Sequence, residues 1–106
     1  MANASAWHNG SPNSNTGAGY GLRVDASYAP IIFQKPWANV ELHLNGQINP
    51  VMINLSHSAK SGRCPELRHK GIGLWLISNR NHQWANGQPP RFTLIQRGSL
   101  NVFDVI

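Results

Sequence analysis

Apolar and polar residues alternate at positions 40–44, within the stretch WANVELHLNG. In an extended chain successive side chains point to opposite faces, so the three aliphatic residues share one face while Glu41 and His43 share the other. The pattern predicts a strand with one buried face and one exposed face.

The dipeptide Asn45-Gly46 follows this strand and predicts a tight hairpin, because both central positions of a type I′ turn require positive φ. Pairing Leu44 with Gln47 across the turn places the apolar residues of segment 51–55 on the same face as those of the first strand. The register and the apolar pattern therefore agree on a second strand.

Shorter patterns predict the remaining small elements. A short helix fits DASYAPIIF at residues 25–33, where Asp25 or Ser27 could cap the first turn and Pro30 stands early in the helix. A glycine-containing turn separates the last two apolar runs. Three more strands are predicted, at residues 19–24, 91–96 and 100–106.

The stretch PELRHKGIGLWLISN predicts the main helix, from residue 65 to 79. Proline is favoured at the first helical position, and an acid is favoured near the positive end of the helix dipole. Gly71 and Gly73 each weaken a helix by about 1 kcal/mol relative to alanine, which predicts that this helix approaches a sheet closely. The predicted inward residues are Leu67, Ile72, Leu74 and Trp75, and the predicted outward residues are Arg68, His69 and Lys70.

Residues 1–19 are rich in Asn, Ser, Gly and Ala, a composition that buries too little apolar surface to offset the entropy of ordering. We therefore expect a flexible arm there and a single globular domain over residues 20–106. Trp7 in this arm docks either on the body, which we favour, or on a partner. The element order β-α-β-β-α-β-β has too few crossover helices for a doubly wound parallel sheet. The predicted fold class is α+β, with one main helix and a small mixed, highly curved sheet or partly open barrel.

Charge favours one class of partner. Nine Lys and Arg stand against four Asp and Glu among 106 residues, and the resulting net charge of +5 favours anionic partners, nucleic acid first. The one cysteine, Cys64, cannot form an internal disulfide, which favours a cytoplasmic location. No apolar run approaches the ~20 residues that span a bilayer, and the N-terminus lacks the pattern of a secretion signal, so no membrane partner is expected.

Cationic and hydroxyl side chains concentrate at the predicted start of the main helix. Lys60, Arg63 and Arg68 stand there among serines, beside a helix N-terminus that itself attracts anions. We predict non-catalytic binding of DNA through phosphate contacts from this basic loop and helix start. Trp37 either packs over the rim of the sheet or stacks on a base. The candidate contact residues from this reasoning are Trp37, His57, Ser58, Lys60, Ser61, Arg63 and Arg68.

Two alternatives belong to other classes of function. A small nuclease or other hydrolase would use His43, which shares a strand face with Glu41, or His57 in the basic loop. A protein-interaction module would instead pair strand edges into a homodimer, at the strand that Pro50 marks as an edge or at the C-terminal strand. The five histidines show no ligand pair on one helix face and no Cys-x-x-Cys partner, so neither a metal site nor a cofactor is predicted.

The last third of the chain, IGLWLISNRNHQWANGQPPRFTLIQRGSLNVFDVI, combines a tryptophan-bearing helix, an asparagine, a glycine-containing turn and two strands. It resembles the closing segment of the DNA-binding pseudobarrel superfamily, which includes plant transcription-factor domains and the effector domains of some restriction endonucleases. The chain departs from that family at Gln88-Pro89-Pro90, where the family carries an acidic residue after the glycine. The resemblance implies that basic arms at the open side of a barrel grip the DNA major groove. The contacts it implies are Arg23, Lys35, Lys60 and Arg63.

Overall fold

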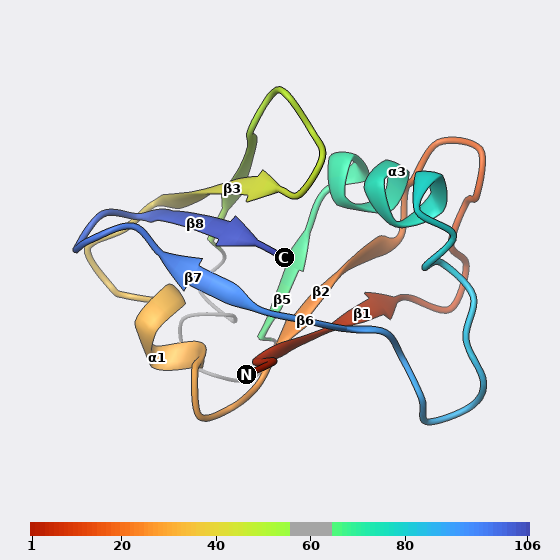
Figure 1. Ribbon diagram of the computed structural model, residues 1–106, viewed down its shortest axis with the longest axis horizontal. Helices are drawn as coiled ribbons and strands as arrows, with labels where there is room; N and C mark the ends of the chain where they lie inside the picture. The colour runs from red at the N-terminus through yellow and green to blue at the C-terminus, as the bar shows by residue number, and fades with distance from the viewer. Residues whose placement is uncertain (56–64) are drawn as a thin grey trace.

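The computed structural model describes residues 1–55 and 65–106 (Figure 1). Its strands are β1 (Ala4–His8), β2 (Tyr20–Val24), β3 (Asn39–Leu44), β4 (Val51–Asn54), β5 (Glu66–Arg68), β6 (Arg91–Phe92), β7 (Leu94–Gln96) and β8 (Val102–Val105). Its helices are α1 (Ala29–Ile32) and α3 (Lys70–Ser78). Sheet A contains β5, β2, β1 and β6 in that spatial order, and sheet B contains β4, β3, β8 and β7. None of the helices in these described ranges has the length and apolar character needed to cross a membrane.

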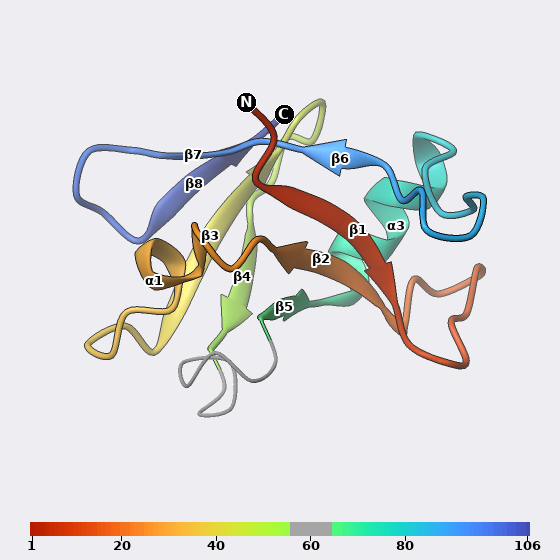
Figure 2. The same cartoon turned by 90° about the horizontal axis from the view of Figure 1, so that it is seen from below.

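One length of chain passes directly from sheet A to sheet B. Strand β6 ends at Phe92 and strand β7 begins at Leu94, and the two run on across the molecule as one ribbon (Figure 2). Strand β6 pairs with β1, whereas β7 pairs with β8. Between them, Thr93 exchanges two backbone hydrogen bonds with Ile106. The two sheets therefore meet along this crossing segment.

The inner faces of both sheets, together with α3, enclose one hydrophobic core. Trp75 of α3 joins the two sheets, because its ring centroid lies 5.0 Å from that of Phe92 in sheet A while its Nε1 donates to the carbonyl of Asn45 at the end of β3, at 2.9 Å. The predicted core position of Trp75 is confirmed. The largest fully buried side chains are Phe103, Leu22, Ile32, Leu42, Leu44, Ile53, Leu67, Ile72, Leu76, Leu94, Val24 and Val40.

The predicted α+β class with one main helix is confirmed, but the predicted single curved sheet or partly open barrel is wrong. That prediction places the strands in one sheet, whereas the described strands form two separate four-stranded sheets. In the described residues β5 and β6 end sheet A, and β4 and β7 end sheet B. The chain changes sheets at Thr93, so β6 and β7 each contribute a short pairing to a different sheet and neither sheet closes.

The predicted flexible arm over residues 1–19 is wrong at residues 4–8. This segment is β1, an interior strand of sheet A that pairs with β2 on one side and with β6 on the other. Ala4 and Ala6 are 0% and 4% exposed in the core. The inward residues of β1 are small, so the composition of the segment did not indicate a buried strand. The neighbouring strands β2 and β6 bury it instead. The prediction that Trp7 docks on the body is confirmed, because its ring packs beneath the guanidinium of Arg68.

The main helix begins at Lys70 rather than at residue 65. His69 is extended, with φ −166° and ψ 143°, and its ring Nδ1 accepts a hydrogen bond from the backbone N–H of Gly71, so it caps the helix. Residues 66–68 form β5, so Leu67 reaches the core as a residue of the sheet and not of the helix. Burial of Ile72 is confirmed, whereas the predicted burial of Leu74 is wrong, since that side chain is 49% exposed.

The predicted hairpin forms with a different register. Leu42 pairs with Val51, so eight residues separate the last pair, six more than the two-residue loop predicted. A turn forms at Asn45-Gly46, because the N–H of Gln47 donates to the carbonyl of Leu44, but only Gly46 has positive φ, at 87°, so the predicted type I′ turn is wrong. A shift of two residues keeps the same side chains on the inner face, which explains why the apolar pattern agreed with both registers.

Two smaller predictions also need correction. Tyr28 stands at the N-cap of α1 without a side-chain hydrogen bond, and Asp25, predicted as a cap, forms an ion pair with Arg91. The C-terminal strand, predicted as an edge for pairing between chains, lies between β3 and β7. The edge predicted from Pro50 is confirmed, since β4 ends sheet B in the described residues.

Gly73 in α3 lies against a loop rather than against a sheet. An ideal Cβ at this position would stand 2.1 Å from the carbonyl oxygen of Gly17, in the connection between β1 and β2. In a free helix Gly→Ala stabilises by about 1 kcal/mol. Because the Gly17 backbone must move here, we expect Gly73→Ala to lower the free energy of unfolding, with an overpacking cost of about 1–3 kcal/mol, as measured by urea denaturation.

Gly10→Ala is the matched control. An added Cβ at Gly10 meets nothing within 4 Å, so its midpoint should stay at that of the parent protein. A stabilised Gly73→Ala protein would show that the loop does not rest on the helix.

Candidate nucleic-acid interface

The outer face of sheet A carries arginines from three strands. Alternation along β2, β5 and β6 turns Arg23, Arg68 and Arg91 away from the core, and all three are exposed. We call these three residues the arginine face. Arg23 and Arg68 are 45 residues apart in sequence, and Arg68 and Arg91 are 23 residues apart. The order of the strands in sheet A brings them to one surface.

One row of the arginine face runs across all four strands. In the register Arg91 stands beside Ser5, Ser5 beside Arg23, and Arg23 beside Glu66. Glu66 forms ion pairs with both arginines: its Oε2 lies 3.4 Å from Arg23 Nε and its Oε1 lies 3.1 Å from Arg68 Nη2. The Glu66 side chain is only 7% exposed. The acid therefore holds two guanidinium groups in place, whose own side chains are 55% and 58% exposed.

The next row places Arg68 over a tryptophan. Gly21 stands between Arg68 of β5 and Trp7 of β1 in the register. Because Gly21 has no side chain, the guanidinium carbon of Arg68 reaches over it to lie 4.8 Å from the centroid of the Trp7 ring. An ideal Cβ at Gly21 would meet the carbonyl oxygen of Leu67 at 2.3 Å, so glycine is also needed for the close approach of β5.

Arg91 is held by a two-point ion pair. Its Nη1 and Nη2 donate to Asp25 Oδ1 and Oδ2, at 3.1 and 2.6 Å. The hydrogen bonds that Arg91 donates to Asp25 raise the pKa of Arg91 above its ordinary value, so this guanidinium stays charged. The pair fixes Arg91 at the end of the arginine face away from Arg68.

A pocket of about 270 Å³ lies at the opposite end of the arginine face, where β5 leads into α3. Its walls combine the Trp7 ring and the Arg68 guanidinium with His69, Lys70 and the start of the connection after β1. His69 accepts the Gly71 N–H through Nδ1, which places the proton of a neutral ring on Nε2. The lining residues are Trp7, Asn9, Ala18, Gly19, Tyr20, Arg68, His69 and Lys70. We call this cavity the Trp7 pocket.

No significant match to the chain was found among protein-family models, curated proteins or solved structures. The chemistry of the site therefore has to be argued from its own residues.

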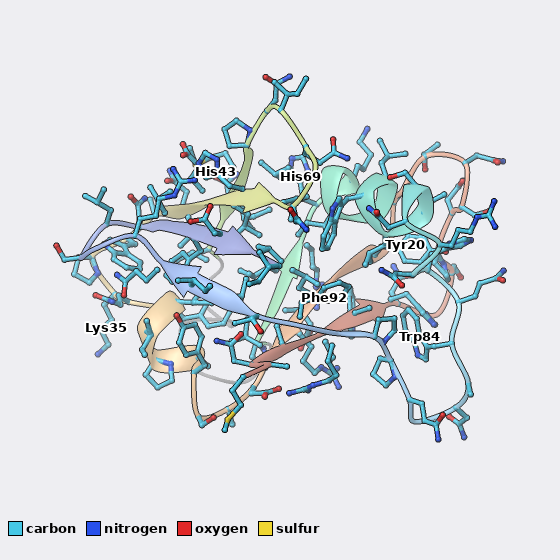
Figure 3. All side chains as sticks on the ribbon, viewed as in Figure 1. Tyr20, Lys35, His43, His69, Trp84 and Phe92 are labelled. Carbon is cyan, nitrogen blue, oxygen red and sulfur yellow. The ribbon has the colours of Figure 1, made fainter. Side chains whose placement is uncertain are left out.

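The predicted contact residues divide between three places. Arg23 and Arg68 meet on the arginine face, on either side of Glu66. Lys35 lies beside α1, at the end of the molecule opposite Tyr20 and Trp84 (Figure 3). Trp37 packs edge-on against Phe103, with ring centroids 6.2 Å apart, which agrees with the rim-packing alternative. The other predicted contacts lie outside the described residues: His57, Ser58, Lys60, Ser61 and Arg63.

Two residues of this surface were not among the predicted contacts. Trp7 was assigned to a flexible arm, although the alternation of Ala4, Ser5, Ala6 and Trp7 is a short strand pattern. Arg91 was placed on a strand without any role, because only the pairing of β6 with β1 brings it into the same row as Arg23, with Ser5 between them.

The outer face of sheet B carries the alternative hydrolytic residues. His43 Nε2 lies 2.6 Å from Glu41 Oε2, which confirms their predicted shared face. Across the parallel pairing His43 stands beside Asp104, whose two oxygens receive Arg97 at 2.9 and 2.7 Å. The hydrogen bonds from Arg97 lower the pKa of Asp104, with a smaller contribution from His43. Within the described residues no three His, Cys, Asp or Glu side chains are grouped to hold a metal ion.

Proposed function

We propose that the protein binds DNA without catalysing a reaction, and that the arginine face makes the phosphate contacts. The observation that carries the proposal is the convergence of Arg23, Arg68 and Arg91 on one exposed sheet face. Guanidinium groups offer five donors in a fixed fork that matches phosphate oxygens. Because the three arginines lie on different strands, they suit an extended anion better than a single small one.

The ion pairs on this face are compatible with phosphate binding. Glu66 and Asp25 take up some of the guanidinium donors and orient the groups, while the remaining N–H donors of the exposed arginines face outward. The net charge of +5 adds long-range attraction for a polyanion.

The basic loop belongs to the same proposal by its position in the chain. Residues 56–64 lead directly into Pro65 and β5, the strand that carries Arg68. We propose that Lys60 and Arg63 extend the phosphate contacts of the arginine face from that loop.

The experiment is a fluorescence-anisotropy titration of labelled DNA from about 50 to 200 mM salt. The variant Arg23→Gln/Glu66→Gln/Arg68→Gln removes two cations and one acid, so it leaves no buried carboxylate unpaired and lowers the net charge by one, from +5 to +4. Loss of two phosphate contacts should make the slope of log affinity against log salt shallower by about 1.8. Affinity at the lower salt concentration should fall about tenfold or more.

Arg97→Gln is the control, since it also lowers the net charge to +4 but acts on the outer face of sheet B. Its salt slope should equal that of the parent. Equal losses in the two variants would show that net charge, and not the arginine face, drives binding; a parent that binds no DNA at low salt would overturn the proposal.

A protein-interaction role has one observation in its favour. Strand β4 ends sheet B in the described residues, and Met52 on its outer face is half exposed. Such an edge can pair with a strand of another chain. Concentration-dependent dimerisation together with absent DNA binding would favour this role over the first.

A further inference from the structure

The placement of Trp7 is not explained by the core. In the described part of the chain its ring packs against the Arg68 guanidinium, whereas Trp37, Trp75 and Trp84 pack in or against the core. A large apolar ring on the outer face of a sheet loses water contact without the dense packing that rewards burial inside. Tryptophan at such a position is typical of a surface that stacks a flat ligand.

We propose that the Trp7 pocket takes one unstacked base of the bound DNA, so that the preferred substrate carries a single-stranded segment. The inference rests on the proposed function, because it extends the path of the phosphates along the arginine face into this pocket. Both surfaces share Arg68, which belongs to the arginine face and to the wall of the pocket.

Size and shape favour a single nucleotide. The pocket volume of about 270 Å³ lies just below the range of about 300–1,000 Å³ that drug-sized ligands occupy. The guanidinium of Arg68 is planar, its in-plane N–H donates to Glu66, and the side chain is 58% exposed. A base can therefore stack on the outer plane of the guanidinium and extend the stack that begins at Trp7.

Polar groups around the pocket suit the rest of a nucleotide. Lys70 supplies a positive charge for a phosphate beside the base, and the Nε2–H of a neutral His69 is a donor. Bases inside a duplex already stack on one another, so their faces are not available to a protein ring. The pocket therefore distinguishes DNA with an unpaired nucleotide from blunt duplex.

The test compares two labelled DNAs with the same number of phosphates. One is a blunt duplex, and the other is a shorter duplex with a single-stranded thymidine tail. The parent protein should prefer the tailed duplex. The Trp7 ring supports the Arg68 guanidinium on which the base stacks. Because base stacking contributes about 1–3 kcal/mol per base, Trp7→Leu should lower this preference about tenfold, while Trp7→Phe, which keeps an aromatic face beneath Arg68, should retain most of it.

Trp84→Leu is the matched control, since Trp84 packs beside His8 and lies outside the lining of the pocket. It should keep the preference of the parent protein, and thermal unfolding of each variant checks that it is folded. A parent that binds both duplexes equally, or a preference unchanged by Trp7→Leu, would overturn the inference and leave the DNA-binding proposal standing. A parent that binds neither duplex would overturn both.

Discussion

A chain that starts at residue 20 is expected not to fold. Without the first 19 residues, sheet A loses β1, which pairs along its whole length with β2 and also holds β6. The core loses Ala4 and Ala6, and the remaining strands expose apolar faces. Small domains are stabilised by only about 5–15 kcal/mol, so loss of an interior strand should abolish the cooperative thermal transition measured by circular dichroism.

A point substitution tests the same strand without truncation. Ala6→Asp places a carboxylate in the core, and an unpaired buried charge is strongly destabilising. Ala26→Asp makes the same change at an exposed position between β2 and α1 and should leave the melting temperature nearly unchanged. Normal folding of the truncated chain would mean that β1 is a peripheral addition to the sheet.

Replacing Trp75 should produce the second largest loss. Its ring connects α3 to Phe92 of sheet A, and its indole N–H reaches the Asn45 carbonyl beside sheet B. Large-to-small changes of a buried aromatic residue cost about 3–5 kcal/mol. We expect Trp75→Ala to lower the free energy of unfolding by that amount in urea denaturation.

A second variant separates packing from the hydrogen bond. Trp75→Phe keeps a ring in the core and removes the donor to Asn45, so its loss should be nearer to 1 kcal/mol, the usual net contribution of a hydrogen bond. If the two variants lost the same free energy, the hydrogen bond and not the ring would join helix and hairpin.

The sequence predicted those parts of the fold that local pattern determines. Alternation at residues 40–44 identified β3 and its outward pair Glu41 and His43, and the apolar spacing around Trp75 identified the main helix. The start of that helix was missed because Pro65-Glu66 fits a first helical turn as well as a strand entry. The pairing of β5 with β2 decides between these, and it depends on residues more than 40 positions away.

The candidate site depends on tertiary structure to a greater degree. Arg68 was predicted as a contact from the basic cluster and Arg23 from the family resemblance, but their meeting over Glu66 follows from the order of strands in sheet A. The gap at Gly21 that lets Arg68 reach Trp7 is likewise a property of register. A sequence pattern gives the face on which a side chain lies; it does not give its neighbour on the next strand.

The segment where the chain changes sheets also determines when folding can finish. Asn3 exchanges hydrogen bonds with the backbone of Leu94 through its side-chain amide, and Ile106 pairs with Thr93, so both ends of the described chain meet at one place (Figure 2). Strand β1 leaves the ribosome well before its partner β6, since Ala4 pairs with Phe92. Contacts of such long sequence separation slow folding, and the new chain must keep β1 from wrong partners until β6 has been synthesised.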